Sequence, residues 1–169
     1  LGGMSALNVE SGLTNEHTLI AFDLTELSID ARDIQSAQLV VDVIYHAQSQ
    51  SGYKGHKEHG HHNEHKGSKG NSSEITLHSI LGEWNEMDAT WNCNVLTNCS
   101  GNWQGGDYNS APIDHVKGKD ISSKTIQFDV STEIKRIING RPNYGWLIKK
   151  KHGGNGIITF SSKEGSIKN

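Results

Sequence analysis

The sequence predicts an all-β protein, a jelly-roll-like β-sandwich with one short α-helix. Short segments rich in β-branched and other apolar residues recur along the 169 residues and are bounded by polar turns, while one stretch alone has a helical period. Glycine is frequent, with 19 residues, and proline is rare, with 2, which is typical of a turn-rich β chain. A chain of this length is the size of one domain, so we expect residues 1–169 to form a single β-sandwich.

The strand prediction rests on alternation of apolar and polar residues. Residues 37–45 alternate most strongly, and in residues 124–130 Ile126, Phe128 and Val130 share one face. The last two segments are joined through a Gly-Gly-Asn turn signal and are expected to form a closing pair. The predicted strands cover residues 19–24, 37–45, 75–80, 124–130, 145–149 and 156–161.

One helix is predicted near residues 132–138. Ser131 or Thr132 can cap its first turn, where Glu133 favours the helix dipole. Three isoleucines then follow at helical spacing and form one apolar stripe, and Asn139-Gly140 ends the helix. The stripe consists of Ile134, Ile137 and Ile138.

Residues 51–73 interrupt the strand pattern with Gly, His, Lys, Glu and Asn. This segment contains one tyrosine and no aliphatic residue, so we expect a long mobile loop inserted within the sandwich. Clustered imidazoles can bind Zn²⁺ or Cu²⁺ without a preformed site, and a solvated loop that binds metal only incidentally is the alternative. The candidate ligands are His56, His59, His61, His62 and His65.

Charge and hydropathy exclude several classes of protein. With 16 Lys and Arg against 19 Asp and Glu, the net charge of −3 gives no reason to expect nucleic-acid binding. No apolar run approaches 18 residues, so no membrane span is predicted. The chain has neither a nucleophile-elbow motif nor a phosphate loop, and we predict that it is not an enzyme and requires no cofactor. A structural Ca²⁺ bound by Asp107, Asp114 and Asp120 is considered, although no calcium-loop spacing is present.

Cys93 and Cys99 are separated by five residues, a spacing that suits either a free reduced pair or a short-loop disulfide. Glycosylation sequons begin at Asn71 and Asn98. Together these features favour a Cys93–Cys99 disulfide and a secreted protein, extracellular or at the cell surface. The sequence begins Leu1-Gly2 rather than with methionine, so we expect a mature, processed or trimmed chain.

Aromatic residues are the candidates for stacking on sugar rings. Trp91 and Trp146 lie in strand-like patterns and are expected in the core. Aromatic residues in loops suit a sugar platform, with anchoring of the loop as the alternative. The basic run Lys149–Lys151 suits an acidic polysaccharide, with a solvated strand end as the alternative. The candidate carbohydrate-binding residues are Trp84, Trp103, Tyr108, Lys149 and Lys151.

Taken in order, the motifs make the chain resemble the DNRLRE-domain family, which overlaps carbohydrate-binding modules found beside polysaccharide lyases and on archaeal and bacterial surface proteins. The resemblance covers nearly the whole chain. Its pieces are Leu7-Asn8-Val9 with residues 19–24, residues 34–39, Trp84-Asn85-Glu86 with residues 89–92, Trp103 with residues 105–108, Phe128-Asp129-Val130 with residues 139–146, and residues 158–162.

The resemblance implies a non-catalytic module that binds polysaccharide, or a structural subunit of an extracellular fibre or surface layer. The six-letter family string is absent, and the His-rich insertion departs from the family pattern. Relative to the family, a first and a last strand are also missing. Either the termini are trimmed, or neighbouring copies supply strands to open edges and build a filament.

Overall fold

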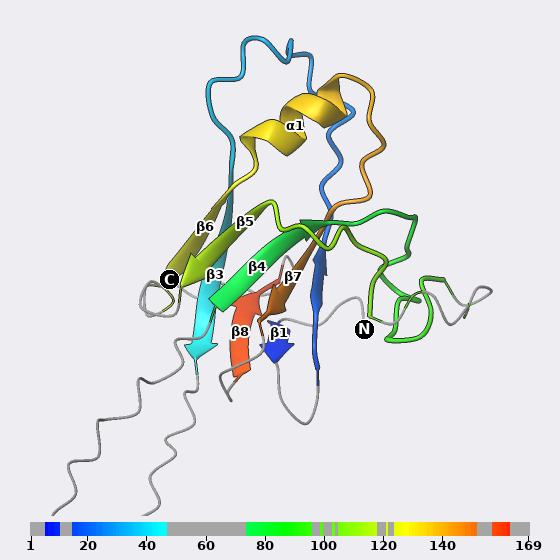
Figure 1. The fold of residues 1–169 in the computed structure, drawn as a ribbon, viewed down its shortest axis with the longest axis vertical. Helices are drawn as coiled ribbons and strands as arrows, with labels where there is room; N and C mark the ends of the chain where they lie inside the picture. Colours follow the sequence, from blue (N-terminus) through cyan, green and yellow to red (C-terminus); the bar gives the residue numbers. More distant parts are fainter. Residues whose placement is uncertain are drawn as a thin grey trace, which may run out of the picture.

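The computed structural model shows two antiparallel four-stranded sheets packed face to face (Figure 1). The predicted loop at 51–73 with its five histidines, and also Asn71, Asn98, Asp120 and the terminal segments discussed above, lie outside the described residues. The structure describes residues 6–10, 15–46, 74–95, 99, 103, 105–117, 121, 124–151 and 157–162.

The first sheet has the order β1-β8-β3-β6, and the second has the order β2-β7-β4-β5. Apart from β4 and β5, consecutive strands switch sheets, which is the double-sheet jelly-roll arrangement. The predicted all-β sandwich with one short helix is therefore confirmed. The strands are β1 (Ala6–Glu10), β2 (Thr18–Ile20), β3 (Gln38–His46), β4 (Glu74–Ser79), β5 (Asp114–Lys117), β6 (Thr125–Asp129), β7 (Trp146–Lys150) and β8 (Ile157–Ser161).

The predicted closing pair is wrong, because β7 and β8 lie in opposite sheets. β7 pairs with β2 and β4, whereas β8 pairs with β1 and β3. Both strands are internal to their sheets, and Ile148 and Ile158 are fully buried between the two layers. The apolar residues of each strand therefore report that the strand is buried, and they carry no information about which strand it pairs with.

The core is filled by alternate residues of both sheets. In β6 the pattern of exposure alternates as predicted, with Ile126 and Phe128 buried and their neighbours exposed. In the first sheet Phe128 lies opposite Leu39, and Phe160 lies opposite Leu7. From the second sheet Ile75, Leu77, Trp146 and Ile148 complete the same cluster.

Helix α1 (Ser131–Ile138) lies at one end of the sandwich, near the loop that joins β2 to β3 (Figure 1). Ile134 and Ile137 pack against the core, as the apolar stripe predicts. The predicted side-chain cap is wrong: Val130 is the N-cap residue and makes no side-chain cap bond. The Ser131 hydroxyl instead bonds the backbone of Ala37, accepting from its N–H at 2.9 Å and donating to its carbonyl at 3.3 Å.

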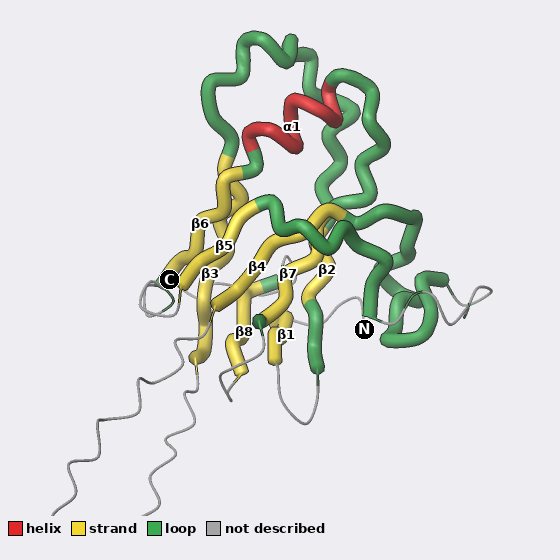
Figure 2. Tube along the Cα trace, viewed as in Figure 1, coloured by secondary structure: helices red, strands yellow, loops and turns green. Residues whose placement is uncertain are grey.

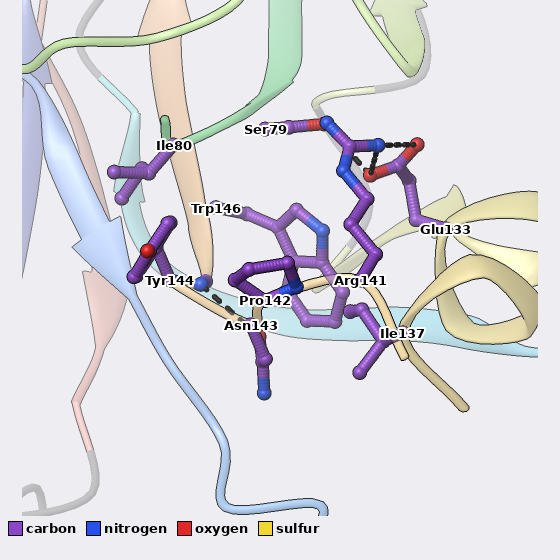
Figure 3. Close-up of a pocket in the computed structure, with 10 residues that line it drawn as sticks. Ser79, Ile80, Glu133, Ile137, Arg141, Pro142, Asn143, Tyr144 and Trp146 are labelled. Atoms are coloured by element: carbon purple, nitrogen blue, oxygen red, sulfur yellow. Dashed lines mark hydrogen bonds and ion pairs between the residues drawn. The ribbon is translucent and has the colours of Figure 1, made fainter. Parts of the chain in front are cut away.

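Glu133 is a buried carboxylate that anchors α1 to the end of β4. Only 5% of Glu133 is exposed, and its oxygens accept from Ser79 Oγ at 2.8 Å, Arg136 at 2.7 Å and Arg141 at 3.2 Å. Figure 3 shows Arg141 reaching Glu133 beside the hollow that Trp146 and Ile137 line. Because these groups satisfy one another, we assign the cluster a structural role.

Two corners of the sandwich are closed by side-chain bonds to the edge strands. Between β1 and β2, Thr18 Oγ1 donates to the carbonyl of Asn8 at 2.9 Å. Between β5 and β6, the backbone N–H of Asp129 donates to Asp114 Oδ2 at 2.7 Å. These bonds occupy backbone groups that an added strand would otherwise use.

None of the helices in the described part of the chain is long and apolar enough to span a membrane.

Candidate functional site

The outer face of the β2-β7-β4-β5 sheet carries the predicted basic residue Lys149. Because Ile75, Leu77 and Ile148 point into the core, their neighbours Thr76, His78 and Lys149 face outward. The long connection between β4 and β5 extends to one side of the strands (Figure 2), and its side chains cover part of this face.

Trp103 and Trp84 anchor this connection. Trp103 is 4% exposed, packs with Ile80 and Leu147, and donates its indole N–H to the carbonyl of Thr90 at 2.9 Å. Trp84 packs against the same cluster and donates to the carbonyl of Tyr144 at 2.7 Å. Trp103 therefore has no open ring face, which corrects the expectation of a sugar platform and matches the anchoring alternative.

Trp91 is the exposed tryptophan of this face, with 42% of the residue open to solvent, so the expectation that it belongs to the core is wrong. Its ring packs directly on Gly105, where an added Cβ would lie 2.6 Å from Trp91 Cζ3. Gly105 also donates its N–H to the carbonyl of Trp91 at 2.6 Å and has a φ of +81°. The absence of a side chain at Gly105 thus supports an indole that remains partly exposed.

His17 lies beside Trp91, immediately before β2. Its ring centre is 5.1 Å from that of Trp91 and 6.0 Å from that of Tyr108. His17 Nδ1 is 2.8 Å from the carbonyl of Gly105, so Nδ1 carries a proton and donates it. Burial, and then the charges of Lys149 and His78, lower the pKa of His17, while the bond to Gly105 opposes this shift.

Tyr108 connects the loop to the strands. Lys149 Nζ donates to Tyr108 Oη at 2.7 Å and lies 4.8 Å from the centre of its ring. Backbone bonds on either side, from Leu81 to Asp107 and from Asn109 to Ser79, continue the β4 pairing and hold Tyr108 over the sheet. The structure therefore brings together two of the predicted binding residues, Tyr108 and Lys149.

Strand register places a row of polar side chains across this face. Thr76 lies opposite Lys149 on one side and His115 on the other, and the pairing of Thr18 with Ile148 puts His17 next to Lys149. The next outward row holds Lys151, whose Nζ is 3.3 Å from Glu74 Oε2. Lys151, the second predicted cation, thus shares the face but is engaged in an ion pair.

His78 is 4% exposed and uses both ring nitrogens. Nδ1 donates to the carbonyl of Asn109 at 2.8 Å, so Nε2 accepts from the Thr76 hydroxyl at 2.9 Å. Burial first, and then the positive charge of Lys149, lower the pKa of His78, whereas the bond to Asn109 opposes this shift. The folded protein therefore favours neutral His78.

We expect the free energy of unfolding to fall as the pH drops below about 6.5, where a histidine in the unfolded chain becomes protonated. Folded His78 binds its proton only at lower pH, so the unfolded state binds more protons in this window. The stabilising contribution is complete above pH 6.5 and is lost on acidification, with a slope of at most about 1.4 kcal/mol per pH unit for one such group.

Urea unfolding of the wild type and of a His78→Gln variant between pH 5 and pH 8 measures this contribution. The variant is expected to be less stable at neutral pH but to depend less steeply on pH below 6.5. Equal slopes for the two proteins would show that His78 does not carry the effect.

Gly105→Ala is expected to displace the Trp91 ring and to reduce stability by about 1–2 kcal/mol. The substitution places a methyl group against the indole and puts alanine at positive φ. Tryptophan fluorescence and thermal unfolding measure the two effects. Gly140→Ala is a matched control, because Gly140 also has positive φ but a Cβ there meets nothing within 4 Å. Equal emission changes in both variants would contradict the proposed contact.

The predicted disulfide joins Cys93 to Cys99, with a Cα–Cα distance of 4.0 Å. It begins two residues after Trp91, and the Cys93 carbonyl accepts from the backbone N–H of Thr90 at 2.8 Å. The disulfide therefore closes the loop immediately adjacent to the exposed indole.

The described residues contain no group of three or more His, Cys, Asp or Glu side chains that could hold a metal ion. Asp114, considered for Ca²⁺, instead accepts from the backbone N–H groups of Asp129 and His115. The histidines proposed for Zn²⁺ or Cu²⁺ lie outside the described residues, so that proposal stays a prediction.

Sequence reasoning missed His17, His78 and His115, because only strand pairing brings these residues to Lys149. An available signal for the placement of Trp91 was the Gly105-Gly106 pair farther along the chain, since glycine allows another group to approach the backbone closely.

These features define a jelly-roll module with a disulfide-closed loop and an outer face that combines aromatic and cationic side chains. No family model, curated protein or solved structure matches the chain. The resemblance to DNRLRE domains thus remains a prediction from the motifs.

Proposed function

We propose that this protein is a non-catalytic module that binds polysaccharide on the outer face of the β2-β7-β4-β5 sheet. The observation that carries the proposal is Trp91, an indole held against Gly105 with 42% of the residue exposed. The C–H groups of a sugar ring pack well on such an aromatic face. The resemblance to DNRLRE domains points to the same class of function.

The ammonium of Lys149 on this face favours an acidic polysaccharide. Lys149, His17 and His115 occupy one row of the face, and Tyr108 positions the Lys149 ammonium. Among the outward strand positions in these rows, Glu74 is the carboxylate, and Lys151 is paired with it. A polymer of uronic acids would supply negative charges to this surface.

Binding without catalysis fits the same residues. Glycosidases commonly need two carboxylates on either side of the scissile bond. The rows of this face supply Glu74 alone, and Glu74 is engaged in an ion pair with Lys151. We therefore propose that the face holds a glycan and leaves it intact.

We also propose an extracellular or cell-surface location. The Cys93–Cys99 disulfide is compatible with an oxidising compartment, and Cys99 is exposed. A polysaccharide ligand would be found in the same surroundings.

The alternative of a fibre subunit requires strand edges that accept a neighbouring chain. At each of the two corners described above, a side chain already bonds one backbone group of an edge strand, Thr18 to Asn8 and Asp114 to Asp129. The described eight strands also complete the jelly-roll order. These observations favour a binding module over a subunit assembled by strand exchange.

Native electrophoresis in gels containing polygalacturonate, alginate or neutral hydroxyethyl cellulose tests the proposed function. The protein is expected to be retarded most by the two uronate polymers, and added salt is expected to weaken this retardation through screening. Migration that none of the three polymers alters, relative to bovine serum albumin as a non-binding standard, would overturn the proposal.

A further inference from the structure

We propose that glycan binding at this face is linked to uptake of a proton by His17, so that the affinity for uronate sugars increases as the pH falls below neutrality. This inference rests on the proposed function and deepens it. It assigns to His17, which was not among the predicted site residues, the role of selecting a negatively charged sugar unit next to Trp91.

The hydrogen bonding of His17 defines what the ring offers to a ligand. Nδ1 donates to the carbonyl of Gly105 at 2.8 Å, and Nε2 has no hydrogen-bond partner among the described residues. In the neutral ring Nε2 carries a lone pair and no proton, so it repels a carboxylate. In the protonated ring Nε2 becomes a charged N–H donor, which attracts a carboxylate.

The surroundings of His17 provide the ammonium of Lys149 and the neutral ring of His78, and they leave the opposite charge to the ligand. Lys149 on β7 and His78 on β4 both face the His17 ring, and Tyr108 lies between these two residues over the sheet. Farther along the same face, His115 follows on β5, and the carboxylate of Glu74 is paired with Lys151. A bound uronate would therefore supply the charge that stabilises protonated His17 beside Lys149.

His17 suits this role better than His78. Both nitrogens of His78 are bonded, to Asn109 and Thr76, and the residue is 4% exposed, so a ligand cannot reach its ring without rearranging the sheet surface. Protonation of His78 is accordingly expected to affect stability alone, whereas protonation of His17 is expected to affect both stability and binding.

Linkage sets the size of the effect. Because the ligand favours protonated His17, the proton favours ligand binding by the same factor. For one proton the association constant increases by at most about tenfold per pH unit, and we expect about tenfold overall between pH 7.5 and pH 5.5. A uronate carboxyl stays ionised in this range, as other carboxyl groups do.

Titration calorimetry with oligogalacturonate and oligoalginate, each beside its methyl ester, measures this linkage. Repeating the titration at pH 6 in two buffers of different ionisation enthalpy counts the protons taken up. With at least one uronate oligomer we expect the tenfold increase and net proton uptake. The esters, which present the same ring without charge, are expected to bind more weakly and with no increase on acidification.

His17→Asn is the decisive variant, because the asparagine amide can still donate to the carbonyl of Gly105 but cannot be protonated. It is expected to lose the increase in affinity for a uronate oligomer between pH 7.5 and pH 5.5, whatever its affinity at pH 7.5. His78→Gln is the matched control and is expected to keep the increase. Thermal unfolding at both pH values verifies that each variant is folded.

The outcomes separate the inference from the proposed function. Uronate binding by the wild type with no dependence on pH and no proton uptake overturns the inference and leaves the proposed function standing. An increase that persists in His17→Asn, or that the methyl esters share, also overturns the inference. Absence of binding to any oligomer at every pH overturns the proposed function and the inference with it.

Discussion

Replacement of Trp91 by alanine is expected to abolish retention on polysaccharide and to lower the free energy of unfolding by about 1–3 kcal/mol. The indole is the exposed aromatic surface next to the row that holds His17 and Lys149, and 42% of the residue is open to solvent. Loss of its stacking area removes a contribution to binding that Lys149 and Tyr108 cannot replace. We expect at least a tenfold weaker association, measured by titration calorimetry and native gel retardation.

Phe22→Ala is a matched control, because Phe22 is an exposed aromatic residue, 50% open to solvent, whose ring contacts Trp146 rather than the cationic face. Its removal is expected to leave binding unchanged. Trp91→Phe should retain part of the affinity, since a smaller ring still stacks. If Trp91→Ala bound as tightly as the wild type, the sugar site would have to lie elsewhere.

Phe160→Ala is expected to lower the free energy of unfolding by about 3–5 kcal/mol. The Phe160 side chain is fully buried and lies on β8, an internal strand, opposite Leu7 of β1 and Val43 of β3. Truncation leaves a cavity between the sheets that surrounding side chains fill only in part. Urea unfolding followed by circular dichroism measures the loss.

Ile44→Ala provides the comparison on the same sheet. Ile44 is 58% exposed and lies at the irregularity in the pairing of β3 with β8. The Ile44→Ala substitution is expected to change the free energy of unfolding by less than about 0.5 kcal/mol. Similar losses of unfolding free energy for Ile44→Ala and Phe160→Ala would contradict the assignment of Phe160 to the buried face and Ile44 to the exposed face of this sheet.

Local periodicity was sufficient to locate most of the regular structure. The alternation in residues 124–130 predicted both the position of β6 and its buried face, and the spacing of Ile134 and Ile137 predicted the helix and its packing face. The short β5 was missed because its sequence, Asp-His-Val-Lys, has a single apolar residue. β2 is shorter than the predicted 19–24 segment, since Phe22 leaves the sheet and is exposed.

The sequence by itself therefore determined the fold class, the apolar faces of the main strands and helix, and the two cysteines available to close a loop. These properties depend on neighbouring residues, whose spacing is set by the chain. Only the tertiary structure decided that β7 and β8 lie in different sheets, that Trp103 is buried while Trp91 is exposed on Gly105, and that His17 lies beside Lys149. These properties depend on strand register and on which loop covers which face, and both are contacts between segments far apart in the chain.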